Sequence, residues 1–328
     1  MATVPGGIFD TGSNSNVDAS QGALISSFLT SLGLSESSIT QITVSTTGTN
    51  TITDTTPTST FSVGTGQTAS VVLSGSSGKT LIVTGSGNAS IVGGSGNDSV
   101  LGGSGSDSIF GGLGDNQIRG GAGNDLIRGG AGNDIVYGGT AADGDGNNLL
   151  EGNLGEDSIV GGTGNDTLRG GKDNDTVEGT AGNNQLYGGQ GDDSLLGGTG
   201  NDTLNGNEGN DILSAGGAIS AELRGGKGND SVVGGTGNDS LYSGMGSDTL
   251  TGGAGDDVFS FKAGDETNVI TDFGTGNDRI EIAGYTFADL SIANNGSGNA
   301  VISMPDGTTI ELQGVDAAAV TSSLFLFS

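Results

Sequence analysis

The sequence contains no cysteine, no histidine and no tryptophan among its 328 residues, and aromatic residues make up only 4% of it. The absence of cysteine excludes disulfides and thiolate chemistry, and the absence of histidine excludes imidazole zinc sites and a histidine general base. Hydrophobic residues account for 31%, which is too little for one large conventional core. The fold therefore needs a further source of stability.

Positive charge is also scarce, with 9 Lys and Arg against 38 Asp and Glu and a formal net charge of −29. So many carboxylates repel one another in a compact state, and the chain has no basic character with which to bind nucleic acid. A hard divalent cation with oxygen ligands is the natural neutraliser. We therefore expect Ca²⁺ as the partner, bound as multiple ions, and no nucleic acid.

Long apolar runs are missing as well, so the sequence predicts no transmembrane segment. The first basic residue is Lys79, and the opening stretch MATVPGGIFDTGSN has no apolar run after the methionine. A Sec-type signal peptide needs both features. We expect either a cytosolic protein or export by a route that reads another part of the chain.

Glycine, by contrast, is abundant, with 69 residues, and from residue 93 to residue 260 it recurs in a nine-residue pattern. The pattern is G-G-x-G-x-D-x-U-x, where U is a large aliphatic residue, as in GGSGNDSVL, GGAGNDLIR and GGTGNDTLR. Two irregular repeats, at 138–151 and 215–224, interrupt it without losing the register. A flexible acidic linker has no reason to keep aliphatic residues at one position of every repeat.

The recurring positions of the repeat each have a physical role. The glycines permit positive φ and close backbone approach, so that turn carbonyls can face an ion. The aspartate at position six supplies a hard anionic oxygen that suits Ca²⁺. The aliphatic residue at position eight must line a narrow core between two sheets. Such a core is too thin to offset the repulsion between carboxylates, so the binding energy of the metal becomes folding energy.

The array resembles the repeats-in-toxin (RTX) family of exported bacterial proteins, over roughly half of the chain. The resemblance implies an all-β fold, a right-handed parallel β-roll or β-solenoid in which two repeats form one coil and calcium lies between turns stacked on the same edge. It also implies a set of ligand candidates at position six, with the asparagines weaker because an amide adds no charge. These candidates are Asp98, Asp107, Asn116, Asp125, Asp134, Asn148, Asp157, Asp166, Asp175, Asn184, Asp193, Asp202, Asp211, Asp230, Asp239, Asp248 and Asp257.

Since alternate repeats lie on opposite edges of such a coil, the candidates divide into two rows. The first edge begins at Asp98 and has successive aspartates from Asp134 to Asp248, whereas the second edge begins at Asp107 and contains both irregular repeats. We hypothesise that the first edge is the calcium spine and the second an adapted surface. Asp143 and Asp145, in the first irregular repeat, are either extra ligands or part of a solvated loop.

The flanks suggest three domains: a Ser/Thr-rich region at 1–83, the β-roll at 84–260 and a capping region at 261–328. Asp18 and Gln21 form a capping-box pattern before an apolar stripe that ends near Gly33, which predicts a short helix. This helix either caps the solenoid or takes part in self-association. Alternating apolar and Ser/Thr residues between 39 and 87 predict short strands that continue the solenoid without calcium.

After the array, the stretch ITDFGTGNDRIEI looks like the segment that follows the repeats in RTX proteases. There we consider Asp265, Asp272 and Asp278 for a last calcium site. A hairpin with a Pro-Asp-Gly turn is predicted within 299–315. The final DAAAVTSSLFLFS resembles type I secretion signals and is also compatible with a capping strand.

No H-E-x-x-H and no G-x-S-x-G motif occurs, and the residues before the array show no cluster of catalytic groups, so we interpret the protein as non-enzymatic. The leading hypothesis is an extracellular or cell-surface protein, exported by the type I machinery. It would fold on calcium outside the cell and assemble as a surface-layer, biofilm-matrix or filament subunit. The alternative is a monomeric calcium-binding adhesin or effector that binds a host surface, glycan or membrane.

Overall fold

The computed structural model describes residues 40–42, 49–52, 58–73, 75–140, 142, 144–217 and 219–328. Within these ranges the chain is all-β, with three short 3₁₀ turns after residue 286 as the helical elements. The helix predicted near 18–32 lies outside the described residues. Contacts divide the chain into two units, residues 1–167 and 168–328.

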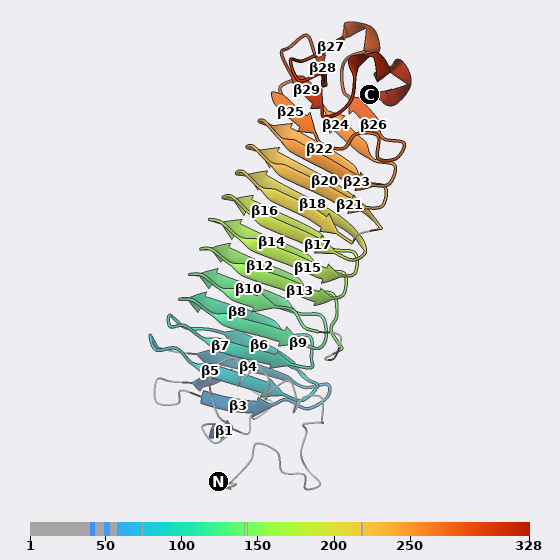
Figure 1. Ribbon diagram of the computed structural model, residues 1–328. Coiled ribbons are helices and arrows are strands. Elements are labelled where there is room, and N and C mark those ends of the chain that lie inside the picture. The colour runs from blue at the N-terminus through green and yellow to red at the C-terminus, as the bar shows by residue number, and fades with distance from the viewer. Residues whose placement is uncertain are drawn as a thin grey trace. The chain divides into compact units, whose positions relative to one another are not determined.

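The first unit is a parallel β-solenoid whose strands alternate between two sheets (Figure 1). Sheet A contains β1 (Thr40–Ile42), β3 (Thr58–Ser62), β5 (Thr80–Thr84), β7 (Ser99–Gly103), β9 (Gln117–Gly121), β11 (Ile135–Tyr137) and β13 (Ser158–Thr163). Sheet B contains β2 (Thr49–Ile52), β4 (Thr68–Leu73), β6 (Asn88–Val92), β8 (Ser108–Leu113), β10 (Leu126–Ala131) and β12 (Leu149–Leu154). The strands predicted from the Ser/Thr alternation are therefore present, as part of the solenoid.

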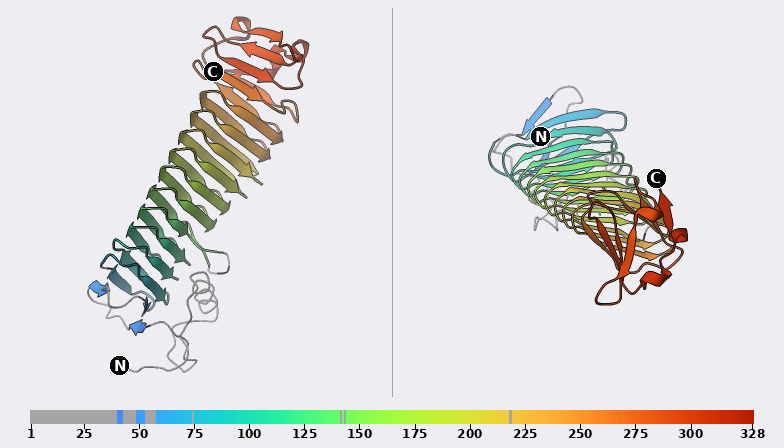
Figure 2. Two further views of the ribbon diagram at one scale, coloured as in Figure 1. Left: turned by 60° about the vertical axis from the view of Figure 1, so that its left-hand side comes forward. Right: turned by 90° about the horizontal axis from the view of Figure 1, so that it is seen from above.

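The second unit continues the same alternation (Figure 2). Its sheet A contains β15 (Thr176–Ala181), β17 (Ser194–Gly198), β19 (Ile212–Gly216), β21 (Ser231–Thr236), β23 (Thr249–Ala254) and β25 (Thr267–Ile270). Its sheet B contains β14 (Thr167–Lys172), β16 (Gln185–Gln190), β18 (Asn201–Glu208), β20 (Ser220–Lys227), β22 (Ser240–Met245), β24 (Val258–Phe261), β26 (Arg279–Ile282) and β30 (Phe325–Phe327).

The core is the column of aliphatic residues at position eight. Ile109 pairs with Ile127 in adjacent strands of sheet B, and Leu195 pairs with Leu213 in sheet A. All four side chains are buried, as the repeat predicts. Because these side chains share an 18-residue register, each coil buries its own pair of aliphatic residues and stacks them on those of the next coil.

The C-terminal region confirms the predicted hairpin. β28 (Ala300–Ser303) runs antiparallel to β29 (Thr309–Leu312), and β27 (Ser291–Asn294) adds a third antiparallel strand. β29 joins sheet A beside β25, while the apolar tail forms β30 beside β26 and buries Phe325. The tail is thus a strand of sheet B in this fold.

Candidate calcium-binding turns

Every predicted ligand residue is no more than 3% exposed and lies just before a strand, except Asp202, which is the second residue of β18. The first-edge residues precede strands of sheet A, and the second-edge residues precede strands of sheet B. The two rows inferred from the repeat register therefore exist within each unit. Ala221 takes position six in the second irregular repeat and leaves a gap in the second row.

The two oxygens of each aspartate do different things. Oδ1 accepts a hydrogen bond from the position-six amide of the preceding turn on the same edge, as in Asp107 to Asp125 at 2.8 Å and Asp193 to Asp211 at 2.8 Å. Oδ2 is buried, and in the following aspartates it has no hydrogen-bond partner: Asp107, Asp125, Asp134, Asp193, Asp202, Asp211, Asp230, Asp239, Asp248 and Asp257. A buried anionic oxygen without a partner is costly, which points to a cation.

Burial also shifts the pKa of these carboxyls. Desolvation raises the pKa of Asp125 to about 8 and that of Asp107, Asp193 and Asp230 to about 7. Hydrogen bonds from backbone amides oppose the shift, and the neighbouring Asp107 carboxylate adds to it at Asp125. Without a cation, the turns therefore hold carboxyls that are partly protonated near neutral pH, and a cation would restore their ionised form.

At four positions another residue takes the place of the aspartate. At each of them a side-chain nitrogen donates to the carbonyl oxygen of position four in its own turn. Asn116 donates to Gly114 at 2.8 Å, Asn148 to Gly146 at 3.2 Å, Asn184 to Gly182 at 3.2 Å and Lys79 to Ser77 at 2.7 Å. Asparagine and lysine thus place a positively polarised nitrogen beside this carbonyl. At the aspartate positions, Oδ2 and the same carbonyl are left for a metal ion.

The oxygen donors of these turns, carboxylates beside backbone carbonyls, fit Ca²⁺, which accepts both. No group of three or more acidic, histidine or cysteine side chains that could hold a metal occurs among the residues with described structure. The position-one glycines make room beside the carboxylate, since a Cβ added at Gly120 would overlap Asp125 Oδ2.

The sequence did not predict a second row of hydrogen bonds between successive turns. The exposed side chain at position five accepts from the position-five amide of the following turn on the same edge, as in Asn97 from Asp115 at 3.0 Å and Asp192 from Asn210 at 2.7 Å. Position-six carboxylates accept from the turn that precedes them, and position-five side chains accept from the turn that follows. Stacked turns are therefore linked in both directions. The recurrence of Asn, Asp and Ser before the ligand aspartate was the sequence signal.

Both edges present the same arrangement, so the geometry does not support a single calcium spine. Buried Oδ2 atoms without a partner occur on the first edge at Asp134 and Asp248 and on the second at Asp107 and Asp257. The local register sets this geometry, and that register is the same on both edges. The edges differ in how often asparagine or alanine replaces aspartate, and the second edge also contains both irregular repeats.

The structure separates the three aspartates considered for a last calcium site. Asp265 lies near Asp248 on the first edge, whereas Asp272 and Asp278 lie near Asp257 on the second. Asp272 accepts from the amides of Gly252 at 2.9 Å and Gly253 at 2.7 Å, and both Asp278 oxygens also accept amide hydrogens. Only Asp265, of these three, keeps a buried oxygen without a partner.

Asp145, in the first irregular repeat, is neither a solvated loop residue nor a ligand with an open oxygen. Its Oδ1 accepts from Gly146 and from the Asn148 amide at 2.9 Å, and its Oδ2 accepts from the Thr163 amide at 2.7 Å. The side chain thus fastens the inserted turn to the next one. Asp143 lies outside the described residues.

Comparison with known proteins agrees with this geometry. A family model described as the RTX calcium-binding nonapeptide repeat matches residues 74–109, 83–118, 110–144, 143–177, 169–204, 187–218 and 223–265, which together cover more than half of the chain. No curated protein sequence matches the chain. In the described part of the chain, no helix has the length and apolar character needed to cross a membrane.

Two solved structures illustrate the likeness. The AlgE6R3 subunit of the mannuronan C5-epimerase from Azotobacter vinelandii is 23% identical, over 48% of this chain and 81% of that one, with a TM-score of 0.26. The extracellular lipase LipA from Serratia marcescens is 19% identical, over 74% of this chain, with a TM-score of 0.23. The chain spans only 40% of the lipase.

Proposed function

Because the chain belongs to the family of RTX calcium-binding nonapeptide repeat proteins, we propose that it is a secreted structural protein whose roll folds on calcium outside the cell. The observation that carries the proposal is the row of buried Oδ2 atoms without partners on both edges. Extracellular calcium is abundant enough to fill weak sites, and cytosolic calcium is not. The chain would stay unfolded for export through a type I channel and fold once outside.

In this proposal the ligands are the position-six aspartates, each acting with turn carbonyls. The asparagine repeats, with an amide nitrogen already beside the position-four carbonyl, need no ion. Lys79 acts as a fixed cation for Asp98, whose Oδ2 also accepts from the Gly94 amide at 3.0 Å. The predicted domain boundaries at residues 83 and 260 then separate a calcium-independent start and a cap from the calcium-dependent array.

We further propose that the roll is the functional object and that the protein is non-enzymatic, assembling into a surface layer, matrix or filament. Apolar side chains on the last strand of sheet B support an end contact, since Leu326 and Phe327 of β30 are 42% and 39% exposed. An outermost strand with exposed apolar residues is a template for association with another chain.

Analytical ultracentrifugation and electron microscopy of the purified chain, with calcium and with a chelator, test both parts. Calcium should convert an expanded chain into a compact one and then into larger assemblies. Calcium-dependent folding with only monomers at high concentration would favour the second candidate, a monomeric adhesin. A chain equally compact in the chelator would contradict calcium-driven folding itself.

A further inference from the structure

The outer face of sheet B in the second unit carries an in-register row of polar and aromatic side chains. The row takes one residue, at position nine, from each successive strand. We call it the sheet B row, and its members are Arg169, Tyr187, Asn205, Arg224, Tyr242, Ser260 and Glu281. Strand pairing places the residues from Tyr187 to Glu281 directly beside one another in this order.

The row contains the same order of side chains twice: an arginine, a tyrosine and then a small polar residue. The Arg224 guanidinium lies 4.2 Å from the centroid of the Tyr242 ring, and that of Arg169 lies 5.5 Å from the Tyr187 ring. Each arginine thus lies on the side of its tyrosine that faces the preceding strand. On the other side lies the smaller Asn205 or Ser260, and at Ser260 there is space beside the ring.

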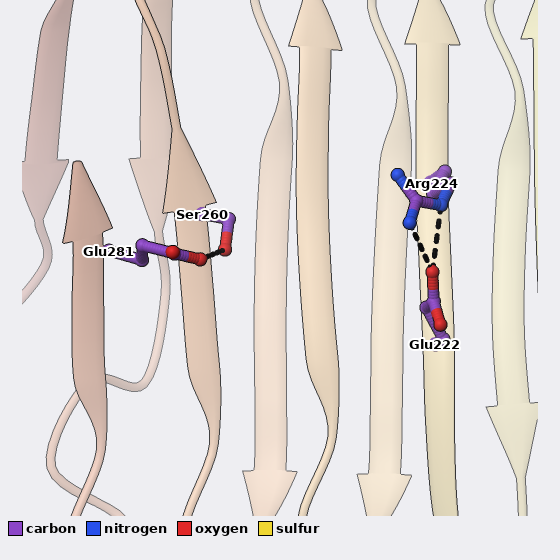
Figure 3. A network of polar contacts seen from close by, with 4 residues as sticks. All are labelled: Glu222, Arg224, Ser260 and Glu281. Atoms are coloured by element: carbon purple, nitrogen blue, oxygen red, sulfur yellow. Dashed lines mark hydrogen bonds and ion pairs between the residues drawn. The ribbon is translucent and has the colours of Figure 1, made fainter. Parts of the chain in front are cut away.

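At the second of these triads the space is a defined hollow of about 360 Å³, within the range of ligand pockets. Gly226, Gly244 and Ser260 line it with small residues, between the longer side chains of Arg224, Tyr242, Lys262 and Glu281, and Asp265 and Ser328 also line it. Figure 3 shows the contact between Glu222 and Arg224 and the hydrogen bond that Ser260 donates to Glu281. These contacts hold an arginine and a carboxylate in place around the hollow.

Positive charge in the second unit is confined to this face. Its basic residues all lie on sheet B or directly after β24, and all are exposed: Arg169, Lys172, Arg224, Lys227, Lys262 and Arg279. The strands of sheet A in this unit contain no lysine or arginine. In a chain of net charge −29, these six basic residues outnumber the three acidic residues on the same strands that are not buried, Glu208, Glu222 and Glu281. This local excess of positive charge is complementary to an anionic ligand.

We propose that the sheet B row binds an extended polysaccharide that carries carboxylate groups, lying across the strands. A sugar ring packs on the open side of Tyr242, and a carboxylate pairs with Arg224 or Lys262. Ser260 and Glu281 bind ring hydroxyls. The first triad provides an equivalent subsite three strand spacings away, about 14 Å, which spans several sugar rings. This binding does not depend on self-assembly.

Isothermal titration of the full chain at saturating calcium with a hyaluronan decasaccharide tests the proposal, with a maltodextrin of equal length as the neutral ligand. Wild-type protein should bind hyaluronan and not maltodextrin, and binding should weaken with salt. Tyr242→Ala should lower the affinity about tenfold, equivalent to one 1.4 kcal/mol interaction. Arg224→Gln, at an exposed position, should weaken binding and reduce its dependence on salt.

The matched control is Tyr137→Ala, because Tyr137 stacks with Arg119 at 5.7 Å on sheet A of the first unit. Circular dichroism at saturating calcium confirms that each variant is folded. The proposal fails if the wild type binds neither ligand, if maltodextrin binds as well as hyaluronan, or if Tyr242→Ala and Arg224→Gln bind as tightly as Tyr137→Ala.

Discussion

The Nζ of Lys79 donates to the carbonyl oxygen of Ser77 at 2.7 Å, in the turn that precedes Asp98 on the first edge. The Lys79 amide also donates to Asp98 Oδ1 at 2.7 Å. The side chain is 3% exposed and lowers the pKa of Asp98 against the larger, opposite effect of burial. The turn that stacks before the first repeat of the array therefore contains a cation that the protein itself supplies.

Lys79→Met removes this cation while keeping most of the apolar volume. Asp98 then loses its nearest positive charge. We expect the free energy of local opening to fall by about 1–3 kcal/mol, which is typical of a buried polar group left without its partner. Hydrogen exchange of the amides in β5 and β7 at saturating calcium measures it. Lys172→Met, at an exposed position, should leave this exchange unchanged, and equal exchange in the two variants would contradict the role given to Lys79.

Asp193→Asn tests the view that an asparagine replaces a bound ion. We expect the new amide nitrogen to donate to the Gly191 carbonyl, as Asn184 donates to Gly182. In a calcium titration followed by circular dichroism, the variant should fold at a lower calcium concentration than wild type, because one site no longer needs an ion, with a change of about 1–3 kcal/mol. Asp193→Ala lacks both the amide and the carboxylate, so it should fold only at a higher calcium concentration than wild type.

The control for this pair is Asp192→Asn at the neighbouring position five, where the side chain is exposed and accepts from Asn210. An amide oxygen can accept the same bond, so its calcium titration should match that of wild type. If Asp193→Asn behaved like Asp192→Asn, the buried Oδ2 would not be a metal ligand.

The calcium-free protein should become more stable as the pH falls from about 8.5 to about 5. Burial raises the pKa of Asp125 to about 8, that of Asp107 to about 7 and that of Asp211 to about 6. An unfolded aspartate titrates near 3.9. Because the folded pKa is the higher one, the stabilisation is complete below the unfolded pKa and is lost as the pH rises through about 6–8.

Circular dichroism in metal-free buffer across this range measures the effect as the fraction of folded chain. With calcium present the trend should shrink, because protons and calcium compete for the same oxygens and calcium wins at high pH. A calcium-free folded fraction that is constant, or that rises with pH, would contradict the buried carboxyls.

Gly120→Ala should destabilise the calcium-loaded protein by about 1–3 kcal/mol, because the added methyl overlaps Asp125 Oδ2 and forces the carboxylate out of its position. Calcium-dependent thermal unfolding measures the loss. Gly217→Ala is the control, since its Cβ would meet only ordinary contacts, the nearest at 3.7 Å from Thr199 Cγ2. Equal unfolding temperatures for the two variants would show that position one does not shape the site.

The nine-residue period determined the fold, because one aliphatic residue per repeat can be buried only if the repeats coil in register. Ile109 over Ile127, the alternation of Asp98 and Asp107 between two edges, and the Pro-Asp-Gly hairpin all follow from local pattern and turn chemistry. A period repeats the same local environment, so position six could be identified as the ligand position without coordinates.

Only the tertiary structure decided what each side chain does within that frame. Sequence spacing could not reveal that Oδ1 accepts a hydrogen bond from the preceding turn while Oδ2 has no partner. Nor could it reveal that Lys79 and Asn116 place nitrogens beside a turn carbonyl. It also grouped Asp265 with Asp272, which lie on opposite edges. Arg224, Tyr242 and Ser260 are 18 residues apart in the chain and become one row only when three coils stack. Such relationships depend on contacts between coils, which no single repeat contains.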